Sequence, residues 1–404
     1  MKKYLFFAVV ALVASAACTK VETEVPDQKI TFQTANYVPS TKAGEVSVLN
    51  DFNEFKCKAF LHAVGVDLDA DGNIINTGSG KPSFQDFFGT AETISPYNAS
   101  GTKLTNLTSE STGVSYWAPS HEYYWPKSAK SYVNFVGWYG TGNGDNNDPN
   151  VSYAYVSNKW KATLEWSFSN STIGAAGANL LYADMAWRYN DNPNAEYKKN
   201  GLANDYKGVP MLFHHALAQI SLKAYASSGS TPALTAGTGT VTDNVATWTI
   251  KLKNVTINGV YTAGTLTLTN EDPGTPTTKK TWDGGWSTSG TAGTMTVSNP
   301  FTVQKVTKET AENVFDATCV LPQDLTNATL TFDLEIKTAY TGGVENTEII
   351  PQTITLPAMT TGGAWAQNTK YTYYLNINPS QKTVRFDPAL IQNWTEGETV
   401  DKTI

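Results

Sequence analysis

Histidines, cysteines and clustered carboxylates are the residues that most often bind metals or catalyse reactions. The chain of 404 residues has four histidines, of which His214 and His215 are adjacent. Adjacent side chains point to opposite faces of a strand and diverge by about 100° on a helix, so this pair cannot share one metal ion. His121 begins HEYYW and lacks the second histidine of the zinc-protease motif HExxH. We expect His214 and His215 to be structural, and we expect no metal site.

The acidic segment Asp67 to Asn73 (DLDADGN) begins like a calcium-binding loop. Carboxylates at its first, third and fifth positions and a glycine at its sixth match that pattern. The twelfth position should carry a bidentate glutamate, but Gly78 stands there. Without the strongest ligand, the pattern favours a polar hairpin tip over a calcium site.

Sequence signatures of the common enzyme classes do not occur in the chain. It has no GxSxG nucleophile elbow, no Walker loop and no dinucleotide fingerprint between a strand and a helix. The formal net charge of −7 provides no basic surface for nucleic acid. We predict a protein without catalytic residues, cofactor or nucleic-acid partner. A hydrolase with carboxylates in long loops is the enzymatic alternative.

Eleven tryptophans suggest a different chemistry, because aromatic faces stack on sugar rings. Trp282 and Trp286 lie in TWDGGWST, a segment with the composition of a loop, and are the candidates for an exposed ligand platform. Large aromatic side chains usually fill β-sandwich cores, so core packing is the simpler explanation for the tryptophans, and ligand contact by Trp282 and Trp286 is the alternative.

The first seventeen residues have the pattern of an export signal. Lys2 and Lys3 precede an apolar run from Tyr4 to Ala14, which is too short to span a bilayer. Small residues follow, and then Cys18 stands where a lipoprotein signal peptidase cuts and where acyl chains such as palmitate are attached. We predict a chain anchored by lipid on Cys18 in the outer membrane of a Gram-negative cell. Secretion with a free cysteine is the alternative.

The other two cysteines, Cys57 and Cys319, are far apart in the sequence. Two cysteines do not form the disulfide framework of a small secreted scaffold. The sequence leaves open whether they pair or stay free.

Apolar and polar residues alternate in many short segments, as they do in half-buried strands. Examples are Lys29 to Ala35 (KITFQTA) and Leu330 to Lys337 (LTFDLEIK). We expect Met211 to Tyr225 (MLFHHALAQISLKAY) to be a strand that closes a first domain, with a helix as the alternative for its first half. The small, polar stretch Ser227 to Gly239 is typical of a linker.

These patterns predict an all-β chain with two β-sandwich domains in tandem. We assign residues 1–17 to a signal peptide and residues 18–45 to a tether, a first strand and a loop. The N-terminal domain then covers residues 46–226, and the C-terminal domain covers residues 227–404.

Several segments, taken in order, resemble the fimbrillin-like proteins of Bacteroidales, which include the major fimbrial subunits and the Mfa-like lipoproteins. Besides the lipoprotein start, the resemblance rests on six segments: STKAG after the first strand, YYWPKSAKSYVNFVGWY, NLLYADM at 179–185, LFHHALAQISLKAY, LPQ at 321–323, and YTYYLNINPSQKTVRF followed by Trp394. No single segment is a signature, but their order is specific.

The resemblance implies that both domains are transthyretin-like β-sandwiches and that a protease removes the first strand before subunits polymerise by donor-strand exchange. Ile30 and Phe32 would then lie on the removable strand, and the cut would fall between Lys42 and Ala43. The family's protease typically cuts after arginine, whereas this chain has only Arg188 and Arg385, far from that loop.

The resemblance places the donor strand near the C-terminus. Thr383 to Phe386 fits, because Val384 and Phe386 alternate with polar residues. The tail after this segment is short and polar, so the chain could also accept a strand without donating one.

Together these features predict a pilin that serves cell adhesion in a fimbrium and has other fimbrial subunits as partners. The alternatives are an anchor or tip subunit and a surface lipoprotein that does not polymerise and binds a glycan or a host protein.

Overall fold

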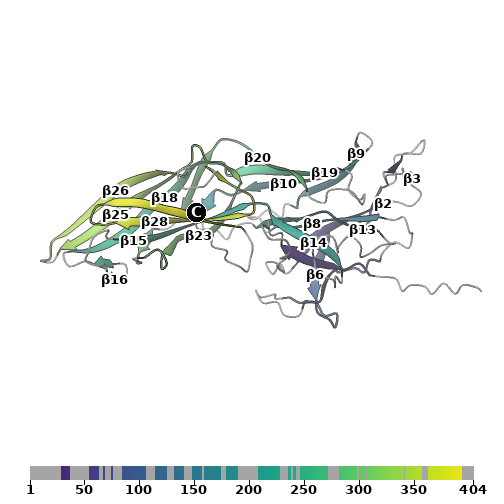
Figure 1. Cartoon of the computed structure of the whole chain (residues 1–404), viewed down its shortest axis with the longest axis horizontal. Coiled ribbons are helices and arrows are strands. Elements are labelled where there is room, and N and C mark those ends of the chain that lie inside the picture. Colours follow the sequence, from purple (N-terminus) through teal and green to yellow (C-terminus); the bar gives the residue numbers. More distant parts are fainter. Residues whose placement is uncertain are drawn as a thin grey trace, which may run out of the picture.

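The computed structural model describes residues 29–36, 54–62, 67–68, 74–75, 84–105, 114–124, 132–140, 148–156, 159–173, 179–189, 208–227, 235–237, 240–242, 246–271, 282–297, 300–305, 307–340, 342–356 and 363–393. Every secondary-structure element in these residues is a strand, which confirms the all-β prediction. This part of the chain contains no helix that is long and apolar enough to cross a membrane. The molecule is elongated, with early strands such as β2 and β8 at one end and late strands such as β25 and β26 at the other (Figure 1).

Nine strands form the sheet at the N-terminal end. In spatial order they are β13 (Ala186–Tyr189), β8 (Tyr132–Gly140), β12 (Leu180–Ala183), β14 (Val209–His215), β1 (Phe32–Asn36), β7 (Tyr116–Pro119), β6 (Glu92–Tyr97), β2 (Phe55–His62) and β5 (Phe84–Asp86). Strand β8 also pairs with β2, so the sheet closes into a ring. One apolar core, which includes Phe55, Phe135 and Phe213, is formed by the buried side chains of these strands.

A four-stranded sheet joins segments that are far apart in the sequence. Its order is β20 (Asp283–Thr288), β19 (Ala263–Glu271), β10 (Lys159–Ser169) and β9 (Asn150–Val156). Its core also contains side chains from both halves of the chain, such as Trp138, Leu164 and Leu268. The two ends of the molecule are therefore connected by a shared core as well as by the backbone.

Two facing sheets build the C-terminal end. The larger contains β11 (Thr172–Ile173), β21 (Gly293–Val297), β18 (Ala246–Val260), β17 (Thr240–Thr242), β16 (Thr235–Gly237), β22 (Phe301–Val303), β25 (Thr329–Tyr340) and β26 (Glu345–Thr355). The smaller is β23 (Glu312–Val320), β15 (Ala218–Ala226), β28 (Thr369–Asn378) and β29 (Thr383–Asn393). Two short pairs complete the elements: β24 (Gln323–Asp324) with β27 (Ala364–Trp365), and β3 (Asp67–Leu68) with β4 (Ile74–Ile75).

Alternation in the sequence explains the core between these two sheets. In β25, Leu330, Phe332, Leu334 and Ile336 are buried, and the residues between them are less buried. Successive side chains of a strand point to opposite faces, so such a segment buries one face and leaves the other in water. The predicted strand over Leu330 to Lys337 is thus confirmed.

The prediction that Met211 to Tyr225 closes the first domain as one strand is wrong. The segment contains two strands, β14 and β15, separated at Ala216 and Leu217. Strand β14 belongs to the N-terminal ring, whereas β15 pairs with β23 and β28 in the C-terminal sheet. The helix alternative for the first half is also wrong, because β14 pairs with β1 and β12. The domain division at 226/227 and the transthyretin-like arrangement remain predictions.

The acidic segment that resembled a calcium loop lies between two short paired strands. Strands β3 and β4 pair with Asp67 opposite Ile75 and Leu68 opposite Ile74. This hairpin agrees with the interpretation of the segment as a hairpin tip. Residues 69–73 lie outside the described residues.

Candidate functional site

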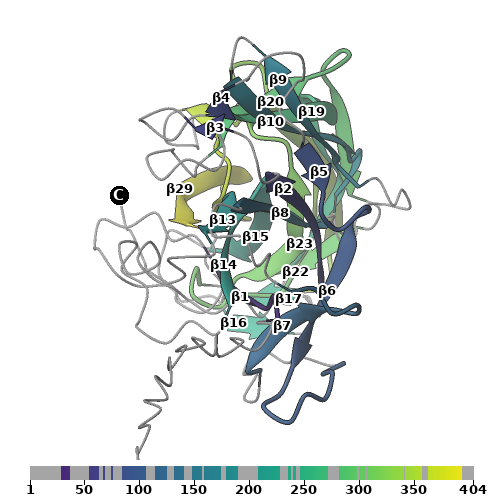
Figure 2. The same cartoon turned by 90° about the vertical axis from the view of Figure 1, so that its right-hand side faces the viewer.

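The first described strand, β1, lies between two strands that come later in the sequence, and it closes the N-terminal ring. Strand β1 pairs in parallel with β14 over five residues, from Phe32 opposite Val209 to Asn36 opposite Phe213. On its other side it pairs antiparallel with β7 through Phe32 and Trp117. Figure 2 shows β1 between β14 and β7. We call the space that β1 fills between these strands the β1 slot.

The side chains predicted to lie on a removable strand point into the core of the ring. Ile30 is 2% exposed and Phe32 is fully buried. The Phe32 ring meets Phe135 edge to face with centroids 5.2 Å apart, and it meets Phe55 in the same way at 6.0 Å. Full burial of each such side chain is worth about 1.5–3 kcal/mol. Strand β1 is therefore part of the core and not a surface strand.

The backbone of β1 passes very close to the start of β14. The Val209 amide donates to the Thr31 carbonyl at 2.7 Å. A Cβ atom at Gly208 would lie 2.7 Å from the Phe32 nitrogen and from the Thr31 carbonyl, which is closer than real Cβ contacts. Glycine at position 208, which has no Cβ atom, therefore allows the backbone of β1 to lie this close to the start of β14.

The residues before β1 are held by the segment after β7. The Ile30 amide donates to the Tyr123 carbonyl at 2.8 Å, and the Lys29 ammonium bonds to the Glu122 carboxylate. That hydrogen bond raises the pKa of Lys29 and, together with one from Tyr124, lowers the pKa of Glu122. Lys29 and Glu122 are exposed to solvent, so this pair contributes little to stability. The buried side chains hold the strand.

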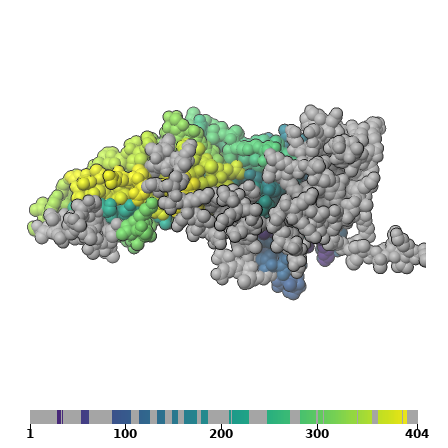
Figure 3. All heavy atoms as spheres, in the orientation of Figure 1, coloured from purple at the N-terminus to yellow at the C-terminus, as the bar shows by residue number. Residues whose placement is uncertain are grey.

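The predicted donor residues occupy the outermost strand of the C-terminal sheet. Strand β29 pairs only with β28 among the described strands, with Val384 opposite Ile377 and Phe386 opposite Leu375. Val384 and Phe386 pack against the C-terminal core but are only partly buried. In the space-filling view, the residues near the C-terminus, coloured yellow, lie on the face of the molecule that is shown (Figure 3).

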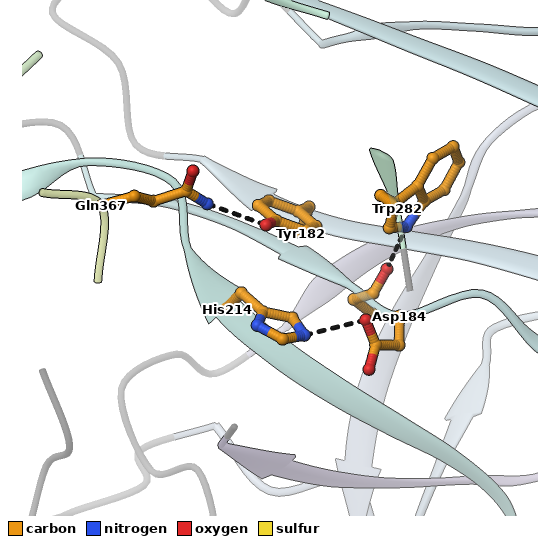
Figure 4. A network of polar contacts seen from close by, with 6 residues as sticks. Tyr182, Asp184, His214, Trp282 and Gln367 are labelled. Carbon is orange, nitrogen blue, oxygen red and sulfur yellow. Dashed lines mark hydrogen bonds and ion pairs between the residues drawn. The ribbon is translucent and has the colours of Figure 1, made fainter. Parts of the chain in front are cut away.

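Both histidines of the adjacent pair have polar partners inside the fold. His214 Nε2 lies 2.8 Å from Asp184 Oδ1, and its ring stacks on Tyr182 with centroids 5.2 Å apart (Figure 4). His215 Nδ1 lies 2.9 Å from Asn179 Oδ1. Burial lowers the pKa of His215 to about 3, with a smaller contribution from the Lys370 charge. The two side chains thus make separate contacts, as the structural interpretation expected.

The two tryptophans considered as a ligand platform are instead part of the junction between the ends of the molecule. Trp282 donates to the Ala183 carbonyl at 2.9 Å (Figure 4). Trp286 donates to the Ala216 carbonyl at 2.5 Å. Trp286 belongs to β20, and both rings pack partly buried against the core that both halves share. The prediction of a loop is therefore wrong for residues 283–288, which form a strand, and distant carbonyl groups accept from both indole N–H groups.

Two more residues at this junction were not predicted from the sequence. Gln367 donates to the Tyr182 hydroxyl at 2.8 Å (Figure 4). The backbone amide of the neighbouring Asn368 donates to the Leu217 carbonyl at 3.0 Å. Neither residue belongs to a sequence motif. The fold brings Gln367 close to β12 and Asn368 close to Leu217, which follows β14. No sequence signal predicted these contacts.

Cys57 and Cys319 are free thiols in separate cores. Burial raises the pKa of both, that of Cys319 to about 12, so neither forms a reactive thiolate at neutral pH. Within the described residues, no three His, Cys, Asp or Glu side chains gather around a common metal position. Cys18, Lys42 and Ala43 lie outside the described residues, and the anchor and the cleavage remain predictions.

The structure is thus an all-β chain whose N-terminal strand completes a core formed by later strands. Comparison with known families gives the specific group: a fimbrillin-like family model matches residues 80–394. The chain therefore belongs to the fimbrillin-like family, and the predicted resemblance is confirmed. Members of this family are structural, non-enzymatic proteins of cell-surface fimbriae.

Several solved bacterial structures are similar to the chain at low sequence identity. A fimbrial protein from Bacteroides vulgatus has 14% identity and a TM-score of 0.46, covering 91% of this chain and 100% of its own. A fimbrial assembly protein from Parabacteroides distasonis has 11% identity and a TM-score of 0.32, covering 89% and 99%. The fimbrial anchor protein Mfa2 from Porphyromonas gingivalis has 12% identity and a TM-score of 0.25, covering 91% and 98%. No curated protein matches the chain.

Proposed function

We propose that this fimbrial protein is a pilin that assembles by donor-strand exchange after proteolytic removal of its first strand, and that the fimbrium serves adhesion. The observation that supports this most directly is the place of β1. It enters the ring from the N-terminal end of the chain and lies between two strands, β14 and β7, that do not pair with each other.

Removal of β1 would expose two kinds of surface at once. Backbone N–H and C=O groups of β14 and β7 would lose their partners, and the space occupied by Ile30 and Phe32 would open into the core. Exposure of these backbone groups and of this apolar space to water is costly. An extended segment of another subunit can pair with the backbone groups and fill the space by strand addition. This gives a physical reason why processing would be followed by polymerisation.

The proposed cut lies between Lys42 and Ala43, in the stretch between β1 and β2. A protease that accepts lysine is required there, since both arginines of the chain lie elsewhere. Before the cut, the chain would be held on the outer membrane by acyl chains on Cys18. After the cut, the lipid would stay with the removed segment, and the processed subunit would be free to join the fimbrium.

The candidate donor is Thr383 to Phe386, with Val384 and Phe386 as the inserting side chains. This strand lies at a sheet edge and pairs on one side only among the described strands, so its release would break one ladder. Two domains in one subunit, with the acceptor at one end of an elongated molecule, would give a head-to-tail shaft.

The alternative is an anchor or tip subunit, or a surface lipoprotein that binds a ligand without polymerising. One observation favours it: Val384 and Phe386 already pack against the core of their own chain. Under this alternative β1 would stay in place or the chain would only accept a strand.

The test is N-terminal sequencing and intact mass of the protein recovered from the cell surface, together with denaturing gels of unheated and heated samples. A pilin should begin at Ala43 and run as high-mass ladders that heat dissolves. An acylated chain that still begins at Cys18 and runs as a monomer would contradict the proposal and support the anchored alternative.

A further inference from the structure

We propose that Pro351 keeps the free edge of β26 from pairing with the same edge of a second copy, and that it thereby prevents side-by-side association of subunits. The inference concerns the C-terminal end of the molecule, where β26 lies (Figure 1). It does not depend on removal of β1 or on strand exchange, and it gives a role in partner selection to a residue far from the β1 slot.

Strand β26 presents a long row of backbone groups on one side. It has 11 residues and pairs only with β25 among the described strands. Its ladder with β25 runs from Glu345 opposite Ala339 to Thr355 opposite Thr329 without an irregularity. A regular edge of this length is a template for another strand, because every second residue directs its N–H and C=O groups outwards.

Two backbone hydrogen bonds just outside this ladder show which residues of β26 face β25. At one end, the Tyr340 amide donates to the Val344 carbonyl at 2.9 Å. At the other end, the Leu356 amide donates to the Ala328 carbonyl at 2.9 Å. Because the direction of the backbone groups alternates along a strand and the register does not shift, even-numbered residues face β25. The odd-numbered residues from 345 to 355 therefore face the free edge.

Pro351 stands in the middle of this free edge. It lies opposite Asp333 in the ladder, at an odd-numbered position whose backbone faces away from β25. Proline has no amide hydrogen, so the ladder with β25 loses no hydrogen bond there. A strand that approached from the free side would lose one, and it would also meet the proline ring. The proline thus divides the free edge into residues 345–349 and 353–355.

Apart from the proline, the residues of this edge favour strand pairing. Thr347, Ile349, Thr353 and Thr355 have β-branched side chains, all of them exposed, and Ile349 is 58% exposed. Such side chains fit a β-sheet surface, and an apolar residue on an exposed edge favours association. The charged residue among the odd positions, Glu345, forms an ion pair with Lys337 at 2.9 Å, which weakens its repulsion of an approaching copy.

A second copy related by a two-fold axis would place its own β26 antiparallel to this one. In the register centred on position 351, Thr347 would lie opposite Thr355, and Ile349 would lie opposite Thr353. The two Pro351 residues would meet at the centre, where neither donates a hydrogen bond. The edge is therefore self-complementary except at the residue that blocks it.

The other long edge of the C-terminal end is interrupted in a different way. Strand β29 also has 11 residues and pairs only with β28 among the described strands. Its ladder has Thr372 opposite Leu390 but Tyr374 opposite Asp387, so β29 contains one extra residue between these pairs. Such a bulge breaks the alternation of an edge strand and increases its twist. The ladder of β26 has no bulge, and Pro351 interrupts its free side instead.

The experiment measures self-association of the uncut chain, so β1 stays in place. Residues 18–404 with Cys18→Ser are compared with the same chain carrying Pro351→Ala, Pro351→Thr or Thr353→Ala. Thr353→Ala is the matched control, because it places alanine on the same face of the same edge without adding an amide hydrogen. Sedimentation velocity over a wide range of protein concentrations measures association. Hydrogen exchange with mass spectrometry measures protection of the amides in residues 345–355.

Both substitutions of Pro351 are expected to raise the association constant at least about tenfold over the parent, because the free edge then has an uninterrupted row of amide groups. Protection of the amides at 347, 349 and 353 should rise with protein concentration, whereas Thr353→Ala should behave like the parent. Addition of Ile349→Lys to Pro351→Ala should reverse the association, because a charge on an edge strand opposes pairing. A misfolded protein that aggregates would not be rescued in this way.

Parent-like sedimentation of both Pro351 variants would overturn the proposal. Association that Ile349→Lys does not reverse, or that leaves the amides of residues 345–355 unprotected, would overturn it as well, since another surface would then be responsible. None of these outcomes bears on the proposed strand exchange, because the chain is never cut and β1 is never released.

Discussion

Phe32 and Phe135 meet edge to face with ring centroids 5.2 Å apart and ring planes at 89°, and both are fully buried. Phe32 comes from the first strand and Phe135 from the long β8 on the far side of the same core. An N-terminal strand is thus fixed by side-chain packing to the centre of a ring formed by later strands. The stability of that ring depends on a strand that the proposed mechanism removes.

Phe32→Ala should destabilise the intact chain by about 3–5 kcal/mol, because it removes a fully buried ring and leaves a cavity among other aromatic side chains. Chemical denaturation followed by tryptophan fluorescence measures the change. Ile349→Ala is the matched control: Ile349 is a large apolar residue but is 58% exposed, so its loss should change the free energy of unfolding by less than about 1 kcal/mol. Equal effects of both variants would show that the packing of Phe32 does not hold β1.

Gly208→Ala should loosen β1 without removing any of its side chains. The added Cβ would meet the backbone at Thr31 and Phe32 at 2.7 Å, and backbone atoms cannot move aside as a flexible side chain can. We expect a loss of about 1–3 kcal/mol, as for overpacking, and faster amide hydrogen exchange at Ile30 and Val209. Gly293→Ala in β21 is the control, because the nearest atom to its added Cβ lies 3.9 Å away. A Gly208→Ala protein with unchanged exchange at both amides would contradict the close approach.

Local pattern in the sequence predicted which residues are buried, but not which strands are neighbours. Alternation in KITFQTA identified Ile30 and Phe32 as one face of a strand, and alternation in LTFDLEIK did the same for β25. Period-two alternation reports the two faces of a strand and carries no information about its partners. Hence the pairing of β10 with β19, which are about a hundred residues apart, could not be predicted from the sequence pattern.

The two errors have the same physical origin. Met211 to Tyr225 keeps its alternation across Ala216 and Leu217, so one strand was predicted although the chain passes there from one sheet to another. TWDGGWST has the glycines of a loop, but pairing with β19 makes it an edge strand, and distant carbonyl groups satisfy its indoles. In both cases tertiary contacts overrode local composition.

Trp286→Phe should show that this tryptophan stabilises the junction between the two ends of the molecule. The substitution keeps a large ring in the shared core but removes the donor to the Ala216 carbonyl. We expect a loss of about 1–2 kcal/mol in the free energy of unfolding, because a carbonyl group at a partly buried site loses its partner. Denaturation monitored at tryptophans of both ends should still give one cooperative transition. Two separate transitions already in the wild-type chain would contradict a rigid junction.

Acid should destabilise the fold through His215. Burial lowers the pKa of this imidazole to about 3 in the folded chain, whereas an unfolded chain restores the ordinary value of 6.5. Below pH 6.5 the unfolded state therefore binds a proton that the folded state rejects, so the stability falls as the pH is lowered and continues to fall towards pH 3. Between pH 7 and pH 5 this single group should cost about 2 kcal/mol.

The variant that checks this is His215→Asn, because asparagine can still donate to Asn179 at the position of Nδ1 and cannot take up a proton. Its stability should vary less between pH 7 and pH 5 than that of the wild type, by about 2 kcal/mol, even if the substitution lowers the stability at pH 7. His121→Asn is the control: the side chain is 77% exposed, and its replacement should leave the wild-type pH profile in place. A His215→Asn profile parallel to the wild type from pH 7 to pH 5 would show that the neutral, buried imidazole is not the source of the acid sensitivity. The denaturation curves must extend from pH 7 to well below pH 6.5, since well above pH 6.5 both states hold the imidazole neutral and the two proteins differ only by a constant.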